Sequence, residues 1–231
     1  MSLTIFKVNK MTAFKLSPST LNLMHECPRC FWLANHKVWN RPSGIFPSLP
    51  SGMDSILKAH FDRFMEKGGL PPELCNLANK KECENLKLFD DKDLLKEWRN
   101  ARKGLWFEDK NGNVLHGGID NLLVNRANGK FIVLDYKTRG FPLKEDTHKH
   151  YQDQLNIYSW LLEKMGHKIE DFAYLMFYYP KEVLEDGEVA FDTVLKKLMV
   201  SPEHAEKLFN NAIKLLNGDC PKKSCEWCER I

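Results

Sequence analysis

The chain has 231 residues, of which 43% are hydrophobic and 28% are charged. These proportions are ordinary for a globular protein, and the length suffices for one sizeable domain. The net charge of +3 is too small to create a strong overall field, so any nucleic-acid surface must be a local patch. No run of about 18 apolar residues is present, and the first residues do not resemble a signal peptide. We therefore expect a cytoplasmic protein with no membrane span.

The first part of the chain is predicted to be mainly helical. Ser17 can cap a helix, and Pro18 suits the first helical position. The prolines of residues 41–50 predict a loop, and the apolar residues that follow recur at helical spacing. The helices predicted in this part cover residues 17–33, 51–67 and 91–103.

Strand signals begin after residue 104, where Asn-Gly pairs indicate tight turns. A strand at 130–137, a helix at 150–165 and an apolar strand at 172–179 form a β-α-β unit, which implies two parallel strands with a right-handed crossover. A last helix is expected at 201–218. We predict a single α/β domain over residues 1–231, in which helices flank a central mixed sheet.

Three charged residues are predicted to meet on the central hairpin. If its turn is centred between Ala127 and Asn128, Asp120 lies directly opposite Asp135, with Cβ atoms roughly 5 Å apart. Lys137 follows Asp135 by two residues, so both side chains point to the same face. A slip of the register by one residue would turn Asp120 to the other face.

Facing carboxylates need a counter-charge, because they repel each other and each is costly to bury unpaired. Their neighbours are apolar, which indicates internal strands. Lys137 supplies one positive charge, and a divalent cation that prefers hard oxygen ligands, Mg²⁺ or Mn²⁺, would supply the rest. Such a centre can activate water and stabilise a phosphodiester under attack. In the alternative interpretation the aspartates lie at a solvated end of the sheet, with Lys137 as a surface partner.

Four of the seven cysteines form two C-x-x-C pairs at opposite ends of the chain, Cys27 with Cys30 and Cys225 with Cys228. One such pair brings two thiolates to one metal from a short turn, and two pairs complete a four-sulfur site. The alternative is that one pair consists of buried thiols. The expected role is structural, joining residues 17–33 to residues 219–231.

The order of the motifs resembles the RecB-type branch of the PD-(D/E)XK nucleases. The resemblance rests on Gly118-Ile119-Asp120, on Asp135-Tyr136-Lys137, on Gln154-x-x-x-Tyr158, and on the opening segment LSPSTLNLMHECPRCFWL. It implies a restriction-endonuclease-like core in which Asp120, Asp135 and the backbone of Tyr136 bind the metal. It also implies that Lys137 orients the attacking water, and that Gln154 and Tyr158 lie near the active site and the DNA.

The family often has a metal-binding histidine a few residues after a glycine of the second helix. Here Gly52 is present, but the next histidine is His60, eight positions on. His60 is therefore a candidate metal ligand, with a core histidine on the apolar stripe as the alternative.

Several RecB-like nucleases, including CRISPR-associated ones and AddB, carry a 4Fe-4S cluster held by one N-terminal and three C-terminal cysteines. This chain departs from that pattern, so the ligands are Cys27 with Cys220, Cys225 and Cys228, or the two pairs with Cys220 free. We prefer the two pairs. Sulfur ligands suit zinc and iron-sulfur alike, and the resemblance favours 4Fe-4S. Cys75 and Cys83 are expected to be ordinary thiols.

Basic residues follow the D-x-K motif, and they either contact phosphates or form a solvated loop. They are Lys137, Arg139, Lys144, His148, Lys149 and His150.

The sequence thus predicts a hydrolase, an Mg²⁺- or Mn²⁺-dependent deoxyribonuclease, with single-stranded ends as a plausible target and repair, recombination or defence as its setting. A helicase or recombination partner has no support in the sequence. The alternatives are an inactive DNA-binding module of the same fold and a metal-stapled interaction protein.

Overall fold

The structure of the protein is a computed structural model that describes residues 13–44, 47–229 and 231. The expectation about a signal peptide falls largely on residues 1–12, which lie outside the described part. Among the described residues, no helix is long and apolar enough to cross a membrane.

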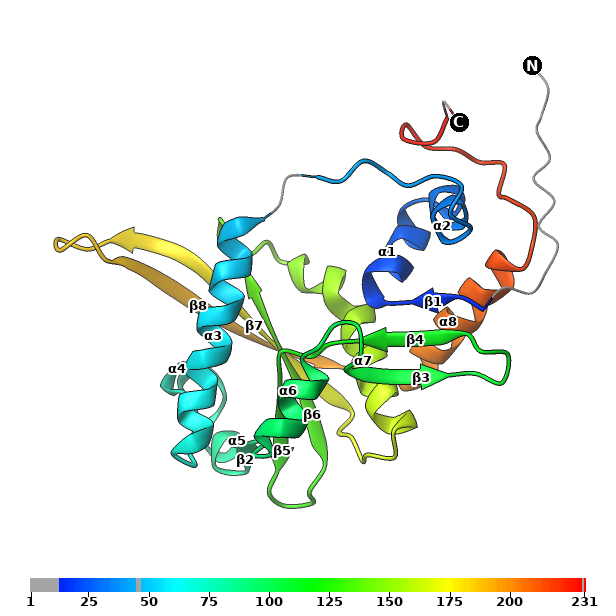
Figure 1. The fold of residues 1–231 in the computed structure, drawn as a ribbon. Helices are drawn as coiled ribbons and strands as arrows, with labels where there is room; N and C mark the ends of the chain where they lie inside the picture. Colours follow the sequence, from blue (N-terminus) through cyan, green and yellow to red (C-terminus); the bar gives the residue numbers. More distant parts are fainter. Residues whose placement is uncertain (1–12, 45–46, 230) are drawn as a thin grey trace.

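After a short first strand, the first part of the chain is mainly helical, and most of the strands lie in its second half (Figure 1). The helices are α1 Pro18–Glu26, α2 Pro28–Asn35, α3 Ser48–Glu66, α4 Pro72–Leu77, α5 Lys80–Glu84, α6 Lys92–Trp98, a 3-10 turn Thr147–Tyr151, α7 Gln152–Lys164 and α8 Pro202–Leu216. The strands are β1 Lys15–Leu16, β2 Leu86–Leu88, β3 Leu105–Glu108, β4 Val114–Gly117, β5 Asn121–Asn125, β6 Phe131–Thr138, β7 Phe172–Val183 and β8 Val189–Met199.

The predicted mixed sheet is confirmed. Its strand order is β2-β5-β6-β7-β8, with β6 and β7 parallel and the other neighbours antiparallel. The parallel pair is joined through α7, as the β-α-β pattern predicts. A second, smaller sheet has the order β1-β4-β3.

Helices cover both faces of β6. Phe61 of α3 packs on the ring of Tyr136, whereas α7 reaches the opposite face through Asp135. On its far side α7 packs against β3 and α8, where Trp160 contacts Phe107 and Phe209. Strands β7 and β8 continue as a long hairpin beyond the helical layers (Figure 1).

The N-terminal helix differs from the prediction, because it is two helices. Cys27 has extended backbone angles and ends α1, while its sulfur accepts a hydrogen bond from the Cys30 amide at the start of α2. Pro28 supplies the physical reason, since a proline disfavours helical backbone in the preceding residue. The predicted cap at Ser17 is confirmed.

Three smaller expectations are also wrong. Ile56 belongs to the apolar residues expected to form the buried face of the helix predicted at 51–67. It points away from the core and is 63% exposed, because the buried stripe of α3 runs through Leu57, Phe61 and Met65. Strand β7 does not end at Pro180 but passes it with a register shift. Cys75 and Cys83 form a disulfide between α4 and α5, where the chain brings their Cα atoms to 5.4 Å.

Leu161 lies on the fully buried side of α7. Leu161→Ala is expected to lower the free energy of unfolding by about 2–5 kcal/mol, because it removes apolar contacts and leaves a cavity. Urea denaturation measures the change. Leu49→Ala is the control, since Leu49 is 68% exposed. Equal effects of the two substitutions would contradict the assignment of α7 to the core.

Candidate active site and cysteine centre

The central hairpin has the predicted register. Asn121 pairs with Leu134 and Leu122 with Val133, so Asp120 at the start of β5 lies across from Asp135. One oxygen of Asp120, Oδ2, accepts a hydrogen bond of 2.9 Å from the Tyr136 amide. Asp135 is only 1% exposed. Two carboxylates from adjacent strands therefore meet at one buried point.

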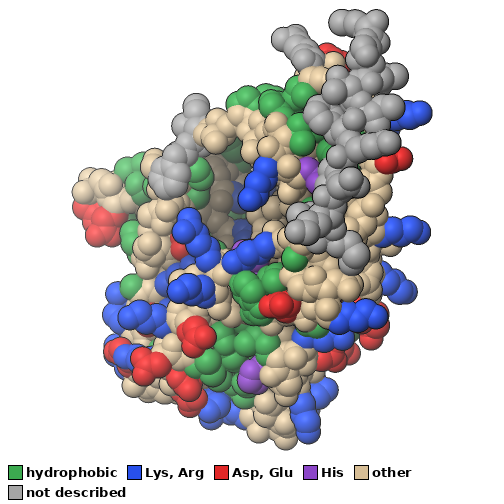
Figure 2. All heavy atoms as spheres, turned by 45° about the vertical axis from the view of Figure 1, so that its right-hand side comes forward, with side chains coloured by type: hydrophobic (Ala, Val, Ile, Leu, Met, Phe, Trp, Pro, Cys, Tyr) green, Lys and Arg blue, Asp and Glu red, His purple; other side chains and the backbone are tan. Residues whose placement is uncertain are grey.

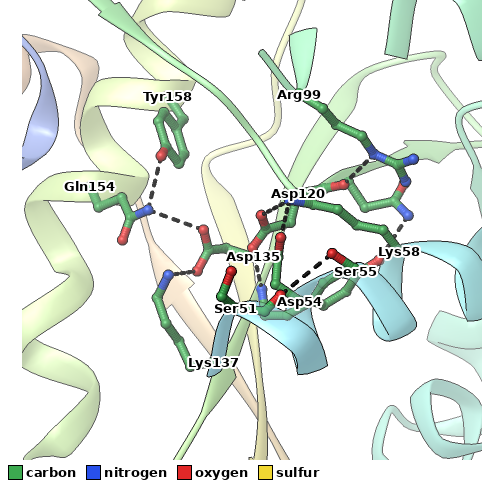
Figure 3. Close-up of polar contacts among 12 residues, drawn as sticks. Ser51, Asp54, Ser55, Lys58, Arg99, Asp120, Asp135, Lys137, Gln154 and Tyr158 are labelled. Carbon is green, nitrogen blue, oxygen red and sulfur yellow. Dashed lines mark hydrogen bonds and ion pairs between the residues drawn. The ribbon is translucent and has the colours of Figure 1, made fainter. Parts of the chain in front are cut away.

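Lys137 and α7 complete one side of this acid centre, which we define as Asp120, Asp135 and Lys137 (Figure 3). The Lys137 ammonium forms an ion pair with Asp135 Oδ2. Gln154 Nε2 lies 3.1 Å from Asp135 Oδ1 and 2.9 Å from the Tyr158 hydroxyl. The structure thus brings together five residues that the sequence selected.

Helix α3 adds two charged residues that the sequence analysis missed. Lys58 Nζ lies 3.1 Å from Asp120 Oδ1 and 2.8 Å from Asp54 Oδ2 (Figure 3). Burial lowers the pKa of Lys58, but the attraction of Asp120 and Asp54 outweighs it, so the pKa lies above the ordinary value. The i,i+4 spacing of Asp54 and Lys58 is a local signal for a helix pair, but it does not indicate which strand they face.

Arg99 fixes the backbone of the first aspartate. Its Nε donates to the Asp120 carbonyl oxygen at 2.8 Å, and its two terminal nitrogens each lie 2.8 Å from an oxygen of Asp62 on α3. A Cβ atom at Gly118 would lie 2.8 Å from the Arg99 carbonyl oxygen. The glycine before Asp120 therefore lets the two chain segments approach.

His60 lies on α3, with its Nε2 2.8 Å from Glu73 Oε1, which also accepts a 3.1 Å hydrogen bond from the Tyr178 hydroxyl. None of its contacts is with the acid centre. Its role as a metal ligand stays a prediction, and Lys58 occupies the side of Asp120 that faces α3.

Burial makes the charge of the acid centre costly. Desolvation raises the pKa of Asp135 to about 7, against the opposing attraction of Lys137. Burial lowers the pKa of Lys137, but Asp135 and Asp120 raise it more, and the net direction is upward. The lysine thus remains a cation beside a carboxyl group that gains from any further positive charge.

The donor set of the acid centre fits a divalent cation. Asp120 and Asp135 offer hard oxygen atoms, as Mg²⁺ and Mn²⁺ prefer. Asp135 Oδ2 is buried and accepts no hydrogen bond, although the Lys137 ammonium is its ion-pair partner. A metal ion would use this acceptor. That the Tyr136 carbonyl provides a third ligand stays a prediction.

The two C-x-x-C pairs meet as predicted, so the fold joins the chain ends. The sulfur atoms of Cys27, Cys30, Cys225 and Cys228 all lie within 4.8 Å of one another. The Cys27–Cys228 and Cys225–Cys228 sulfur distances are 3.8 Å, and the Cys30–Cys225 distance is 3.5 Å. Beside them, α2 is tied to the end of α8 by a 3.0 Å hydrogen bond from Trp32 Nε1 to the Gly218 carbonyl oxygen.

These distances suit one tetrahedral ion. Zinc–sulfur bonds of about 2.3 Å place the four sulfur atoms of a tetrahedron ~3.8 Å apart. In a 4Fe-4S cluster each cysteine binds a different iron atom, which requires the thiolates to lie farther apart.

Basic side chains border this cysteine centre. Arg41 lies 3.7 Å from the Cys225 sulfur, and Arg29 lies 3.6 Å from that of Cys220. Cys220 is absent from the group of four.

With this geometry established, comparisons with known proteins add the family. The model of the PD-(D/E)XK nuclease superfamily matches residues 15–230. The chain belongs to this superfamily. Among solved structures, that of SSO0001 matches 95% of this chain and 85% of its own, with 16% sequence identity and a TM-score of 0.39. A comparison with curated proteins gives no match. The family indicates a nuclease and therefore a nucleic-acid substrate.

The raised pKa of Asp135 predicts a pH dependence of stability in metal-free buffer. Relative to Asp135→Asn, the wild-type free energy of unfolding is expected to fall as the pH rises from about 4 to about 7. In that window the folded state binds more protons than the unfolded state, so a rise in pH favours unfolding. Urea denaturation across the pH range measures the difference.

Added Mg²⁺ should restore stability near pH 7, because it binds the charged carboxylates of the folded state. Asp186→Asn, in an exposed turn, is the control; it keeps Asp135 and should respond to pH and Mg²⁺ as wild type does. A pH-independent difference between wild type and Asp135→Asn would contradict the prediction.

Proposed function

We propose that the protein is a Mg²⁺- or Mn²⁺-dependent deoxyribonuclease whose active site is the acid centre. The observation that carries this proposal is the meeting of Asp120, Asp135 and Lys137 on one buried hairpin. Buried facing carboxylates destabilise a fold unless a cation compensates them. Perturbed groups of this kind cluster at functional sites, and the superfamily is one of nucleases.

In the proposed mechanism, Asp120 and Asp135 hold the cation through their oxygen atoms, with the Tyr136 carbonyl as a further donor. When bound, Mg²⁺ or Mn²⁺ polarises a water molecule and neutralises charge on the phosphate. Lys137 orients that water through its ammonium group. Water adds to phosphorus, one phosphate ester bond breaks, and the departing oxygen receives a proton.

Gln154 and Tyr158 support the acid centre from α7. The Gln154 amide donates to Asp135 Oδ1, which fixes the carboxylate plane and directs its other oxygen toward Lys137. The Tyr158 hydroxyl bonds the same amide, and burial raises the pKa of this phenol. Tyr158 therefore remains a neutral hydrogen-bond partner at physiological pH.

Lys58 contacts Asp120 from α3, the helix on which the resemblance led us to expect a metal-binding histidine. An ammonium group at this point neutralises part of the charge on Asp120 and can contact a phosphate oxygen of the substrate. We infer that Lys58 acts as a fixed cation beside the metal ion, while His60 serves the contact with Glu73.

For the cysteine centre we propose Zn²⁺ on Cys27, Cys30, Cys225 and Cys228, in preference to the 4Fe-4S cluster that the resemblance favours. The support is that three pairs of these sulfur atoms lie 3.5–3.8 Å apart and that all four lie within 4.8 Å of one another. The role is structural, because the site ties α2 to the C-terminal tail. Cys220, which lies beside Arg29 instead, is not a ligand in this proposal.

The finer assignments remain proposals as well. They are a RecB-like branch, action on single-stranded DNA ends as an exonuclease, a role in repair, recombination or defence, and a cytoplasmic location.

Lys137→Ala is expected to lower the rate of DNA cleavage by about 10²–10³-fold or more, because it removes a preorganised charge from the reacting centre. Cleavage of labelled single- and double-stranded DNA, with Mg²⁺, Mn²⁺ or EDTA, measures the loss. Lys207→Ala on the exposed side of α8 is the control. If folded Lys137→Ala cuts as fast as wild type, the assignment is wrong. Salt-sensitive binding without cleavage in any metal would indicate the inactive binding module instead.

Cys225→Ser is expected to remove one equivalent of zinc per chain and to lower the melting temperature, because binding of a structural ion contributes directly to folding. Cys220→Ser should retain both. Elemental analysis and the visible spectrum of anaerobically purified protein provide the readouts. About four irons per chain with a brown chromophore would refute the zinc proposal.

A further inference from the structure

A cavity of about 870 Å³ lies beside the acid centre. Its walls come from the start of α1, the loop between α6 and β3, the end of β4, and the segment that leads into α7. We call it the α1–α7 cavity. It falls within the roughly 300–1,000 Å³ range of clefts that hold one small ligand, so it has room for a few groups of nucleotide size.

Two residues that line the cavity, Gln154 and Tyr151, contact the acid centre, and Tyr158 is linked to it through Gln154. Gln154 donates to Asp135 at 3.1 Å, and Tyr158 bonds Gln154 at 2.9 Å. The ring of Tyr151 lies 5.0 Å from Lys137 Nζ. The cavity and the acid centre thus share a wall. A phosphodiester held at Asp135 would place its neighbouring nucleotide against that wall.

The charge of the cavity suits a polyanion. Arg102 and Lys149 line it, are exposed, and form no ion pair among residues 13–44 and 47–229. Its one lining carboxylate, Asp153, is engaged by His25 and His204, each at 2.9 Å. The N-terminus of α1, with its partial positive charge, faces the same space. Figure 2 shows a hollow on this side of the molecule with Lys and Arg side chains around it.

The glycines in the cavity wall allow close packing within the protein itself. A Cβ atom at Gly117 would lie 2.6 Å from the Tyr158 ring, and one at Gly118 would lie 2.8 Å from the Arg99 carbonyl oxygen; both glycines line the cavity. The wall next to Asp120 is therefore backbone packed directly against neighbouring segments. Tyr151, half-buried at the opposite wall, offers a ring face on which a base can stack. A single strand has unpaired bases available for such stacking, whereas the bases of a duplex are already paired and stacked on one another.

We propose that the α1–α7 cavity binds the nucleotides of a single DNA strand next to the scissile phosphate, with Arg102 and Lys149 on the phosphates and Tyr151 against a base. This inference rests on the proposed nuclease function. It specifies that the substrate is bound as a single strand and where on the protein that strand lies. It also gives Lys149, one of the basic residues after the D-x-K motif, a defined contact.

The test measures binding separately from cleavage. In EDTA, the affinity for a fluorescent oligothymidylate of about ten nucleotides is determined for the double variant Arg102→Gln, Lys149→Gln. The control is Lys110→Gln, Lys207→Gln, which removes the same charge outside the cavity. The cavity variant should bind about tenfold or more weakly at low salt. Its salt slope should be smaller by about 1.4, because each phosphate contact on a single strand contributes ~0.7.

Ser19→Glu provides a second variant whose fold is not at risk. A glutamate in the first turn of α1 favours the helix, but it places a negative charge at the cavity wall. It should weaken binding while the melting temperature stays the same or rises. If both cavity variants bind as tightly as the control, the inference is overturned. The inference is also overturned if the double variant at Arg102 and Lys149 loses as much affinity for a duplex of the same length as it loses for the single strand.

Cleavage of the same oligonucleotide with Mg²⁺ separates the two levels of the argument. If wild type cleaves the oligonucleotide but the cavity variants bind it as tightly as wild type does, the cavity is not the strand-binding site, and the nuclease function still stands. Binding that depends on the cavity, with no cleavage in Mg²⁺ or Mn²⁺, refutes the nuclease function and supports the cavity as a strand-binding site.

Discussion

The burial of Asp135 beside Asp120 is the constraint on which the site depends. A carboxylate that is 1% exposed would weaken the fold unless neighbouring groups supplied positive charge and hydrogen bonds. Lys137 comes from the same strand, Gln154 from α7 and Lys58 from α3. The helices on both faces of β6 thus hold the cations and donors that make the acid pair tolerable.

The sequence was sufficient for the parts of the site that depend on local geometry. The Asn128-Gly129 turn sets the hairpin register, and the two-residue period of a strand then places Asp135 and Lys137 on one face. Gln154 and Tyr158 are four positions apart on one helix, so they also share a face. The break between α1 and α2 was missed, although Pro28 is a local signal for it because a proline restricts the preceding residue, Cys27.

The contacts that the sequence could not provide all cross between distant elements. Nothing local in the sequence distinguishes Lys58 and Arg99 from other charged residues. Their role follows only from the packing of α3 and of the end of α6 against Asp120. The disulfide between α4 and α5 likewise depends on how the turn between these two short helices brings Cys75 and Cys83 together. Tertiary packing decides these positions, and local propensity contains no information about it.

The cysteine centre has a consequence for the order of folding. Two of its cysteines, Cys27 and Cys228, are separated by 201 residues, so the quartet cannot assemble before nearly the whole described chain has left the ribosome. Contacts of such sequence separation are slow to form. A nascent chain that stops before Cys228 keeps α2 without its closing partner. If the quartet binds zinc as proposed, a chain can bind it only after Cys228 has been synthesised. A chain truncated before that point would lack this contact between its ends and would be cut more readily by proteases.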